Sequence, residues 1–258
     1  MFFIGVCRLL RCLVYVMRIK KVKKMTNTPN AFFEIIDKVS MLRQFNLFSD
    51  LTEEELQDLA RSTSIKAVGK HRYIYRSGDE SNYLYVLING TIKIGNTSID
   101  GKEVIKTILH PTALFGESGL GSSDERKSFA KAIDSEVRLL QIHVDGFKEL
   151  MKSNFDFNLK VVENLGMKIH KIESRLESLV FNDARTRIVE FIKENANNFG
   201  RKVGYEMLLK HSLTQQDIAN FTGTSRQTVT SVLNDLRNSN QIYFKRKSIL
   251  IRDLSTLA

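Results

Sequence analysis

The chain has 258 residues, of which 42% are hydrophobic and 26% charged, so a wholly disordered protein is excluded and two modest domains are within reach. Its two cysteines, Cys7 and Cys12, are too few for a disulfide scaffold, or for a zinc site or an iron–sulfur cluster built on several cysteines. The formal net charge of +10 is unevenly spread: residues 1–24 carry +7, residues 25–182 carry −2 and residues 183–258 carry +5. A slightly acidic body is therefore followed by a basic C-terminal quarter, and such local excess is typical of surfaces that meet nucleic acid.

Residues 1–29 form a basic and apolar N-terminal extension in our interpretation. The longest uncharged runs there, Met1–Cys7 and Cys12–Met17, are too short to cross a bilayer, which needs about 20 apolar residues. A secretory signal would place its positive charge before the apolar stretch, whereas here a Lys-rich run follows it. One hypothesis is an amphipathic segment on a membrane surface; we favour an upstream extension, with translation starting at Met25. We therefore expect no stable membrane insertion.

Residues 30–152 are predicted to form one domain that opens with two short helices. Apolar side chains at helical spacing within Ala31–Leu47 predict the first helix. Thr52 followed by Glu55 makes a capping-box pattern for the second. Ordinary covering helices explain both patterns.

Short apolar runs separated by turn residues follow from Ser64 to about Ile142. Asn89-Gly90 and Asp100-Gly101 lie between apolar runs, and such pairs predict β-hairpins. Several strands at roughly even spacing are typical of an antiparallel β-roll of the jelly-roll kind. The fold class is therefore α+β, with the β-roll in the N-terminal part.

Residues 153–182 are predicted to form a long dimerisation helix. Its apolar residues recur three and four positions apart, which is close to the 3.5-residue period of a helix–helix seam, while the other positions are strongly charged. We favour a homodimer over packing of this stripe against the chain's own β-roll. The stripe at the expected dimer interface comprises Val162, Leu165, Ile169, Ile172, Leu176 and Leu179.

Residues 183–258 carry the pattern of a helix-turn-helix. Thr214 and Asp217 make a capping pattern for one helix, Gly223 supplies a permissive turn, and Ser225 can cap a second helix. Arg offers a bidentate fork to guanine, Gln to adenine, and Thr a methyl contact to thymine. The DNA-binding residues predicted in this motif are Thr214, Gln215, Ser225, Arg226, Gln227, Thr228, Thr230 and Ser231.

A basic hairpin is predicted after the second helix. Ile242-Tyr243-Phe244 and Ser248–Ile251 flank a turn formed by Lys245, Arg246 and Lys247. Such a wing would contact phosphates, which adds affinity without sequence choice. A structural helical hairpin that binds no nucleic acid is the alternative. The spacing of the motif, the basic wing and the local charge all favour binding to double-stranded DNA.

The order of β-roll, long helix and winged helix-turn-helix resembles the CRP/FNR family of bacterial transcription regulators, from about Leu42 to Leu254. Thr224–Val229 is similar to the opening of the family's recognition helix, and Phe115–Leu120 is similar to its phosphate-binding cassette. The resemblance implies a cytoplasmic homodimer that binds DNA and RNA polymerase and acts as activator or repressor. The β-roll would sense a small effector and reposition the two recognition helices.

The resemblance also implies an effector site, with Gly116 supplying a backbone N–H to a cyclic phosphate, Glu117 a carboxylate to the ribose and Arg126 a positive charge to the phosphate. Lys127 stands where the family has Ser or Thr, and Ile172 and Glu173 stand where cyclic-AMP-binding members offer hydroxyls. These differences argue against cyclic AMP and leave a cyclic nucleotide, another effector or none open. The candidate effector residues are Gly116, Glu117, Ser118, Arg126 and Lys127.

Enzyme motifs and cofactor motifs are weak in this sequence. Two cysteines cannot supply the four ligands of an iron–sulfur cluster, and the five histidines are scattered without a His-x-His pair. We predict no catalytic residues and no metal site. The alternative is a cupin-like metal-dependent enzyme, or a ligand-binding module whose helical tail does not bind DNA.

Overall fold

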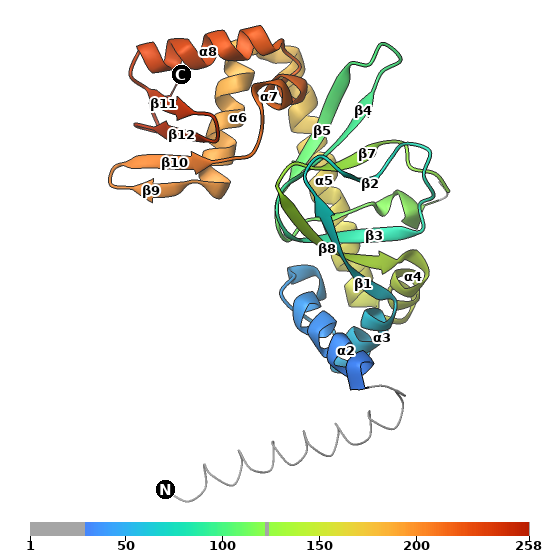
Figure 1. Cartoon of the computed structure of the whole chain (residues 1–258). Coiled ribbons are helices and arrows are strands. Elements are labelled where there is room, and N and C mark those ends of the chain that lie inside the picture. Colours follow the sequence, from blue (N-terminus) through green and yellow to red (C-terminus); the bar gives the residue numbers. More distant parts are fainter. Residues whose placement is uncertain (1–28, 122–123, 258) are drawn as a thin grey trace, which may run out of the picture.

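The computed structural model describes residues 29–121 and 124–257, and Figure 1 shows three parts in a row along one long helix. A small group of helices lies at one end, a β-roll in the middle and a mixed helix and sheet unit at the other end. Residues 1–28 of the predicted N-terminal extension, with Cys7 and Cys12, lie outside the described residues. In the described part of the chain, no helix is both long and apolar enough to cross a membrane.

The β-roll consists of two four-stranded antiparallel sheets, which confirms the predicted fold class. The first sheet has the order β1-β8-β3-β6, with bounds Thr63–Gly69, Glu136–His143, Tyr83–Asn89 and Leu114–Phe115. The second has the order β2-β7-β4-β5, with bounds Tyr73–Tyr75, Phe129–Ala132, Ile92–Thr97 and Glu103–Leu109.

Strand β3 of the first sheet is buried on both faces. On β3, Leu84 and Val86 belong to the core shared with the helices, whereas Tyr85 and Leu87 belong to the core between the two sheets. A strand with two buried faces has no polar face to alternate with. This is why β3 is a continuous apolar run in the sequence.

The Asn89-Gly90 hairpin prediction is wrong. Strand β3 pairs with β8 and β6, whereas β4 pairs with β5 and β7, so the chain changes sheets at this turn. Gly90 has φ +89°, and a Cβ there would lie 2.8 Å from the Glu136 carbonyl oxygen, so the turn demands glycine for a sheet crossing. The Asp100-Gly101 prediction is confirmed, because β4 and β5 pair directly across it.

The helices at the first end pack on the outer face of the β1–β8–β3 sheet. They are α2 (Pro29–Leu42), the 3₁₀ turn η1 (Asn46–Phe48), α3 (Glu53–Arg61) and α4 (Val144–Ser153). Thr52 caps α3 in the predicted capping box with Glu55. Phe48 is fully buried there, 5.9 Å from the Phe157 ring, and so ties this group to the start of the long helix.

The long helix α5 (Phe155–Phe181) begins at Asn154, whose side chain accepts a hydrogen bond from the Phe157 N–H at 2.9 Å. Phe157 and Val161 are buried, whereas the residues of the predicted dimer stripe are exposed by 36–68% in this single chain. Asp183 then caps α6 (Ala184–Phe199), which starts the C-terminal unit.

The C-terminal unit combines helices α6, α7 (Gln215–Thr222) and α8 (Arg226–Asn238) with one four-stranded antiparallel sheet. The sheet has the order β11-β12-β10-β9, with bounds Ile242–Lys245, Ser248–Ile251, Glu206–Lys210 and Arg201–Val203. Our sequence analysis predicted the two strands of the wing but not β9 and β10. These strands extend the wing into a sheet, and Leu209 of β10 joins Ile249 in the core beneath the helices.

Candidate functional site

Hydrogen bonds cap the start of each helix of the helix-turn-helix. The Thr214 hydroxyl accepts the Asp217 N–H at 3.0 Å, and the Asp217 carboxylate accepts the Thr214 N–H at 2.9 Å, so both predicted capping partners are engaged. Gly223 ends α7 with φ +66°, in the left-handed region that favours glycine. Ser225 caps α8 by accepting the Thr228 N–H at 3.0 Å. The sequence pattern and the structure agree throughout this motif.

Helix α8 has one apolar and one polar side. Val229, Val232, Leu233 and Leu236 are buried against the rest of the C-terminal unit. On the other side, Ser225, Arg226, Gln227 and Ser231 are exposed, and Thr228 and Thr230 are half-buried. A rigid helix with short polar side chains around one arginine and one glutamine has the shape and the donors for major-groove contacts.

Gln215 and Thr230 connect the two helices of the motif. The Thr230 hydroxyl lies 2.9 Å from Gln215 Oε1 and 2.9 Å from the Arg226 carbonyl oxygen, and donates its one hydrogen between them. With its carbonyl oxygen accepting, the Gln215 amide keeps both N–H donors for another partner. Gln215 lies at the N-terminus of α7, where a phosphate is favoured by the free backbone N–H groups.

Arg187 is a positioning residue of this motif that our sequence analysis missed. From α6, its Nε donates to the Thr222 carbonyl at 2.9 Å and its Nη1 to the Asn182 carbonyl at 2.6 Å, while Nη2 lies 3.4 Å from the Gly223 carbonyl oxygen. One guanidinium thus holds the end of α7 and the turn to the junction of α5 and α6. No local pattern marks this contact, because Arg187 and Thr222 are 35 positions apart.

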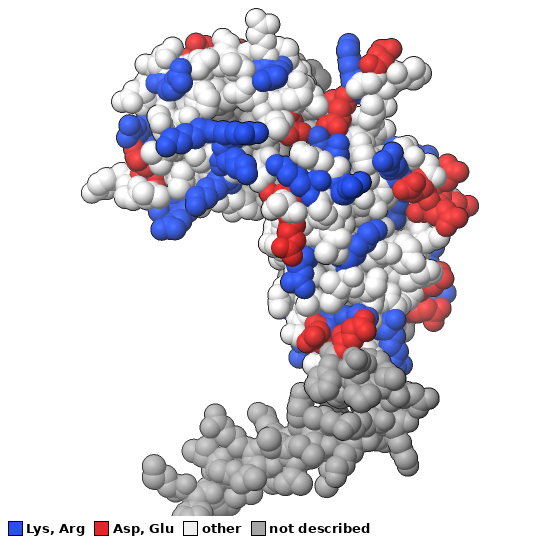
Figure 2. Space-filling model, viewed as in Figure 1, with Lys and Arg blue, Asp and Glu red and all other residues white. Residues whose placement is uncertain are grey.

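The basic wing lies at the turn between β11 and β12. Lys245, Arg246 and Lys247 are all exposed. Figure 2 shows Lys and Arg side chains outnumbering acidic ones on the visible face of the C-terminal unit, as the charge count of residues 183–258 requires. The wing and the polar side of α8 belong to the same unit, so one duplex can meet both.

Two of the predicted effector residues, Gly116 and Ser118, contact a third, the buried Arg126. Arg126 is only 2% exposed, and its Nη1 donates to the Gly116 carbonyl at 2.7 Å and to the Ser118 hydroxyl at 3.2 Å. Its Nη2 donates to the Tyr83 carbonyl, and its guanidinium lies 4.5 Å above the Tyr75 ring. The structure therefore brings Gly116, Ser118 and Arg126 together.

Two polar atoms in this region are buried and have no hydrogen-bond partner among the residues that the structure describes. They are Arg126 Nε and Ser81 Oγ. Burial raises the pKa of Tyr75 to about 12, partly offset by the charge of Arg126, so the ring under the guanidinium stays neutral. An anion could take the free Nε donor, but a larger one would have to displace the bonds of Arg126 to Gly116 and Tyr83.

Glu117 is engaged by a residue of the long helix. Lys168 of α5 makes an ion pair with the Glu117 carboxylate and donates to the Leu114 carbonyl at 2.6 Å. The carboxylate expected to accept a ribose hydroxyl therefore already has a charged partner within the chain. Our sequence analysis missed Lys168, because 51 positions separate the two residues.

Three other predicted residues lie apart from this cluster in the single chain. The Lys127 side chain is exposed, and its carbonyl accepts a hydrogen bond from the Asn96 side chain at 3.0 Å. Ile172 is 68% exposed, and Glu173 lies 3.4 Å from His170 on the surface of α5.

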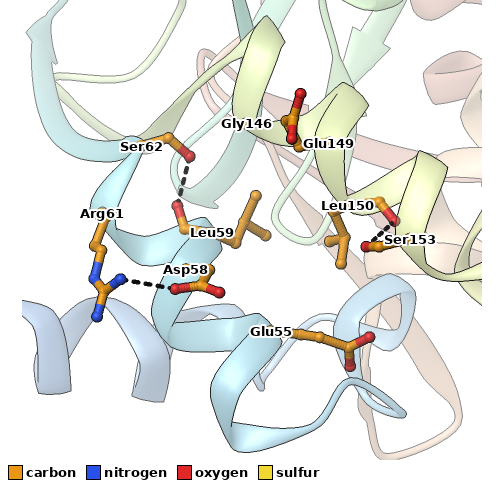
Figure 3. A pocket seen from close by; sticks show the side chains of 9 residues that line it. All are labelled: Glu55, Asp58, Leu59, Arg61, Ser62, Gly146, Glu149, Leu150 and Ser153. Atoms are coloured by element: carbon orange, nitrogen blue, oxygen red, sulfur yellow. Dashed lines mark hydrogen bonds and ion pairs between the residues drawn. The ribbon is translucent and has the colours of Figure 1, made fainter.

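A groove of about 560 Å³ lies between α3 and α4, at the far end of the β-roll from the helix-turn-helix. Figure 3 shows three interactions among the lining residues: Asp58 pairs with Arg61 at 2.9 Å, Ser62 donates to the Leu59 carbonyl at 3.0 Å and Ser153 donates to the Leu150 carbonyl at 3.1 Å. Within residues 29–121 and 124–257, no three His, Cys, Asp or Glu side chains gather in a group that could hold a metal ion. The candidate functional sites are therefore the helix-turn-helix and the group formed by Gly116, Ser118 and Arg126, which we call the Arg126 cluster.

Family models match both the β-roll and the helix-turn-helix unit. A family model described as a cyclic nucleotide-binding domain matches residues 65–154, and a Crp-like helix-turn-helix domain matches residues 186–258. A CRP-like cAMP-activated global transcriptional regulator of Mycobacterium tuberculosis is 30% identical over 185 residues, which cover 72% of this chain and 82% of the relative. The chain belongs to the CRP/FNR family of transcription regulators.

Other CRP/FNR relatives differ in what their names say about them. A global nitrogen regulator of Synechocystis is 26% identical over 73% of this chain and 84% of its own length. An anaerobic regulatory protein of Bacillus subtilis is 26% identical over 75% of this chain and 82% of its own length. The names of these relatives differ from that of the cAMP-activated regulator, so family membership does not identify the effector.

Solved structures share the CRP/FNR fold. FixK2 from Bradyrhizobium japonicum has a TM-score of 0.68 at 19% identity and covers 76% of this chain and 95% of its own. A CooA variant from Carboxydothermus hydrogenoformans has a TM-score of 0.67 at 23% identity and covers 84% of this chain and 93% of its own. The predicted family and fold are confirmed, and the cupin-like enzyme alternative finds no support.

Proposed function

We propose that this CRP/FNR regulator works as a homodimer in the cytoplasm and binds a pseudo-palindromic DNA site. The observation that carries the proposal is the polar side of α8, where Arg226 and Gln227 are exposed on a capped, rigid helix. A two-fold dimer places two such helices in successive major grooves, about 34 Å apart. Gln215 and the wing residues Lys245, Arg246 and Lys247 contact phosphates on either side.

The exposed stripe on α5 supports the dimer. Leu176 is 62% exposed and Ile172 68% exposed, although both are large apolar residues in a helix of 27 residues. A stripe with a 3.5-residue period buries itself best against a second copy of the same helix. Bound in this way, the dimer would meet RNA polymerase on DNA as an activator or a repressor.

The β-roll senses a small effector other than cyclic AMP in this proposal. Lys168 neutralises Glu117, and Arg126 is bound to the carbonyls of Gly116 and Tyr83. An effector at this cluster has to exchange these contacts for its own. Since Lys168 belongs to α5, such an exchange would reach the dimer helix directly, and the effector would act through its different affinity for two arrangements of that helix.

The test is selection of duplexes from a randomised DNA pool with the purified full chain at low ionic strength. We expect enrichment of sites with two-fold symmetry and half-site centres one helical turn, about 34 Å, apart. Enrichment of a single half-site would contradict the dimer. Failure to retain any duplex would overturn the proposed DNA binding.

A further inference from the structure

A second group of charged residues, outside both sites, joins the β-roll to the helix-turn-helix. Lys93 of β4 lies with its Nζ 2.6 Å from Glu103 Oε1 of β5 and 2.6 Å from Asp217 Oδ1 of α7. The three side chains are 12%, 21% and 12% exposed. We call Lys93, Glu103 and Asp217 the Lys93 cluster.

Asp217 has two roles in this arrangement. Its Oδ2 caps α7 through Thr214, and its Oδ1 accepts from Lys93. Burial raises the pKa of the Asp217 carboxyl, but hydrogen bonds from Lys93 and Thr214 outweigh burial and lower it below the usual value. Asn220, one turn further along α7, donates to Glu103 at 3.3 Å. The β4–β5 hairpin therefore holds the first helix of the DNA-binding motif at two positions.

Arg175 of α5 reinforces the same contact. Its Nη2 donates to the Ile105 carbonyl of β5 at 2.7 Å and to the Phe221 carbonyl of α7, and its Nη1 donates to the Lys106 carbonyl. Its guanidinium also lies 4.0 Å above the Phe221 ring. Arg175 thus brings the dimer helix, the β-roll and the helix-turn-helix to one point.

Apolar contacts complete the interface between the two units. Ile133 of the β-roll is 3% exposed and belongs to the core of the C-terminal unit, and Ile108 packs against that core. The rings of His110 and Phe199 lie 3.7 Å apart. Figure 1 shows α7 beside β5, with α8 on the far side of α7. The contact therefore leaves the polar side of α8 free.

We propose that Lys93 is a positioning residue for DNA binding, which fixes the helix-turn-helix on the β4–β5 hairpin with its recognition helix exposed. The inference rests on the proposed function, because it concerns the same DNA-binding surface. A recognition helix held in one orientation loses little freedom when it binds, whereas a loosely tethered one must be ordered at the expense of affinity.

Removal of Lys93 alone should separate the two units. In Lys93→Met, the Glu103 and Asp217 carboxylates face each other across the interface without a counter-charge, and buried unpaired charges are strongly unfavourable. The triple variant Lys93→Met, Glu103→Gln, Asp217→Asn removes that repulsion, and the amide oxygen introduced by the third substitution would still accept from Thr214. Lys102→Met is the matched control, because Lys102 is an exposed lysine of the same hairpin with no ion pair in the described part of the chain.

The first measurement is a spin-label distance within the full chain. Labels are attached through Ser64→Cys on β1 and Glu194→Cys on α6, both exposed, after Cys7→Ser and Cys12→Ser. Labelled protein is diluted with unlabelled protein so that each measured pair lies within one chain. We expect a narrow distance distribution for the otherwise unchanged chain and for Lys102→Met, a broad one for Lys93→Met, and a narrow one again for the triple variant.

The second measurement is affinity for the duplex that the unchanged chain enriches from a randomised pool, and for a scrambled duplex. We expect Lys93→Met to weaken binding to the enriched duplex on the order of tenfold, to leave the scrambled duplex unaffected, and the triple variant to recover most of the loss. An unchanged or tighter affinity of Lys93→Met, a narrow distance distribution in it, or a triple variant as defective as Lys93→Met would overturn the inference. If no duplex binds at all, the proposed function fails while the spin-label distances still decide the role of Lys93.

Discussion

Arg226 is the single residue on which DNA recognition depends most in our proposal. It is the first residue of α8, and Ser225 caps the helix directly before it. The capped N-terminus fixes the backbone from which the guanidinium projects, and the side chain is exposed. A guanidinium on a rigid backbone can make two parallel hydrogen bonds to one guanine, which gives both affinity and sequence choice.

Arg226→Ala should cost about 1–3 kcal/mol of binding free energy for the enriched duplex and relax the preference at one base pair of each half-site. The reason is the loss of a bidentate contact to a base edge. Titration of fluorescent duplexes that carry every base at each position measures both effects. An Arg226→Ala protein that keeps its full sequence preference would contradict the assignment.

Arg246→Ala should weaken binding to the enriched and the scrambled duplex by the same factor. Arg246 is exposed at the tip of the wing, where it can meet phosphates but not base edges. Binding curves at several salt concentrations should also show the salt slope reduced by about 1. The wing assignment fails if this substitution changes which sequence is preferred.

Local sequence patterns were sufficient for the residues of the helix-turn-helix. The caps at Thr214 and Ser225 and the turn at Gly223 depend on neighbours within four positions, and the structure confirms each of them. Arg187 and Lys168 were missed because their partners are far away in the chain. An arginine or lysine in a charged helix gives no local sign that it will meet a distant carbonyl or carboxylate.

At the scale of an element, α5 combines two surfaces on one helix. Phe157 and Val161 face the chain's own helices, and Lys168 and Arg175 reach the β-roll. The apolar stripe next to them is exposed, and helical periodicity predicted its position. The periodicity alone left open whether the β-roll or a second chain covers it; the exposure of the stripe in the single chain favours a second chain.

Leu176→Glu should shift the purified protein from dimer to monomer. Burial of one leucine side chain contributes about 1.5–3 kcal/mol to association. Because the dimer has a two-fold axis, the substitution removes two leucines from the interface and brings two like charges together there. Light scattering after gel filtration, at micromolar concentration, measures the mass. Met167→Glu is the matched control, because Met167 is 60% exposed but lies off the stripe. A Leu176→Glu protein with a dimer mass would contradict the proposed interface.

In the β-roll, the residues of a turn do not by themselves show whether the strands on either side of it pair. Both Asn89-Gly90 and Asp100-Gly101 make turns with a glycine at positive φ. Only the second joins two paired strands, because β3 has both faces buried and pairs with β8. Turn residues show where the chain reverses, but which strands pair depends on burial across the whole domain.

At the scale of the whole molecule, helix α5 contacts the β-roll and the helix-turn-helix and also carries the proposed dimer surface. Its Lys168 contacts the Arg126 region through Glu117, its stripe forms the proposed dimer surface, and its Arg175 contacts α7. The proposed effector cluster and the DNA-binding unit are therefore both in contact with one helix. In our proposal, these contacts along α5 are the physical link through which an effector would be coupled to DNA binding.

Calorimetry with cyclic AMP and cyclic GMP should show no binding tighter than about 10 μM, which corresponds to about −7 kcal/mol. A cyclic nucleotide would have to separate Lys168 from Glu117 and Arg126 from two carbonyls, while Ile172 and Glu173 offer no hydroxyl to its base. Lys168→Met removes the ion-pair partner of Glu117. If this ion pair opposes the binding of a cyclic nucleotide, the variant should bind cyclic AMP or cyclic GMP more tightly than the unchanged chain. Binding of either nucleotide to the unchanged chain below about 10 μM would contradict this expectation.

The sequence by itself determined what depends on neighbours along the chain. Caps, turns, the apolar stripe of α5 and the polar side of α8 follow from side chains within one or two helical turns, where geometry is nearly independent of the rest of the molecule. Only the tertiary structure decided which strands pair, that Lys168 neutralises Glu117, and that Lys93 joins β4 to α7. Such contacts depend on the summed burial of whole elements, which places residues such as Lys93 and Asp217 together across 124 positions.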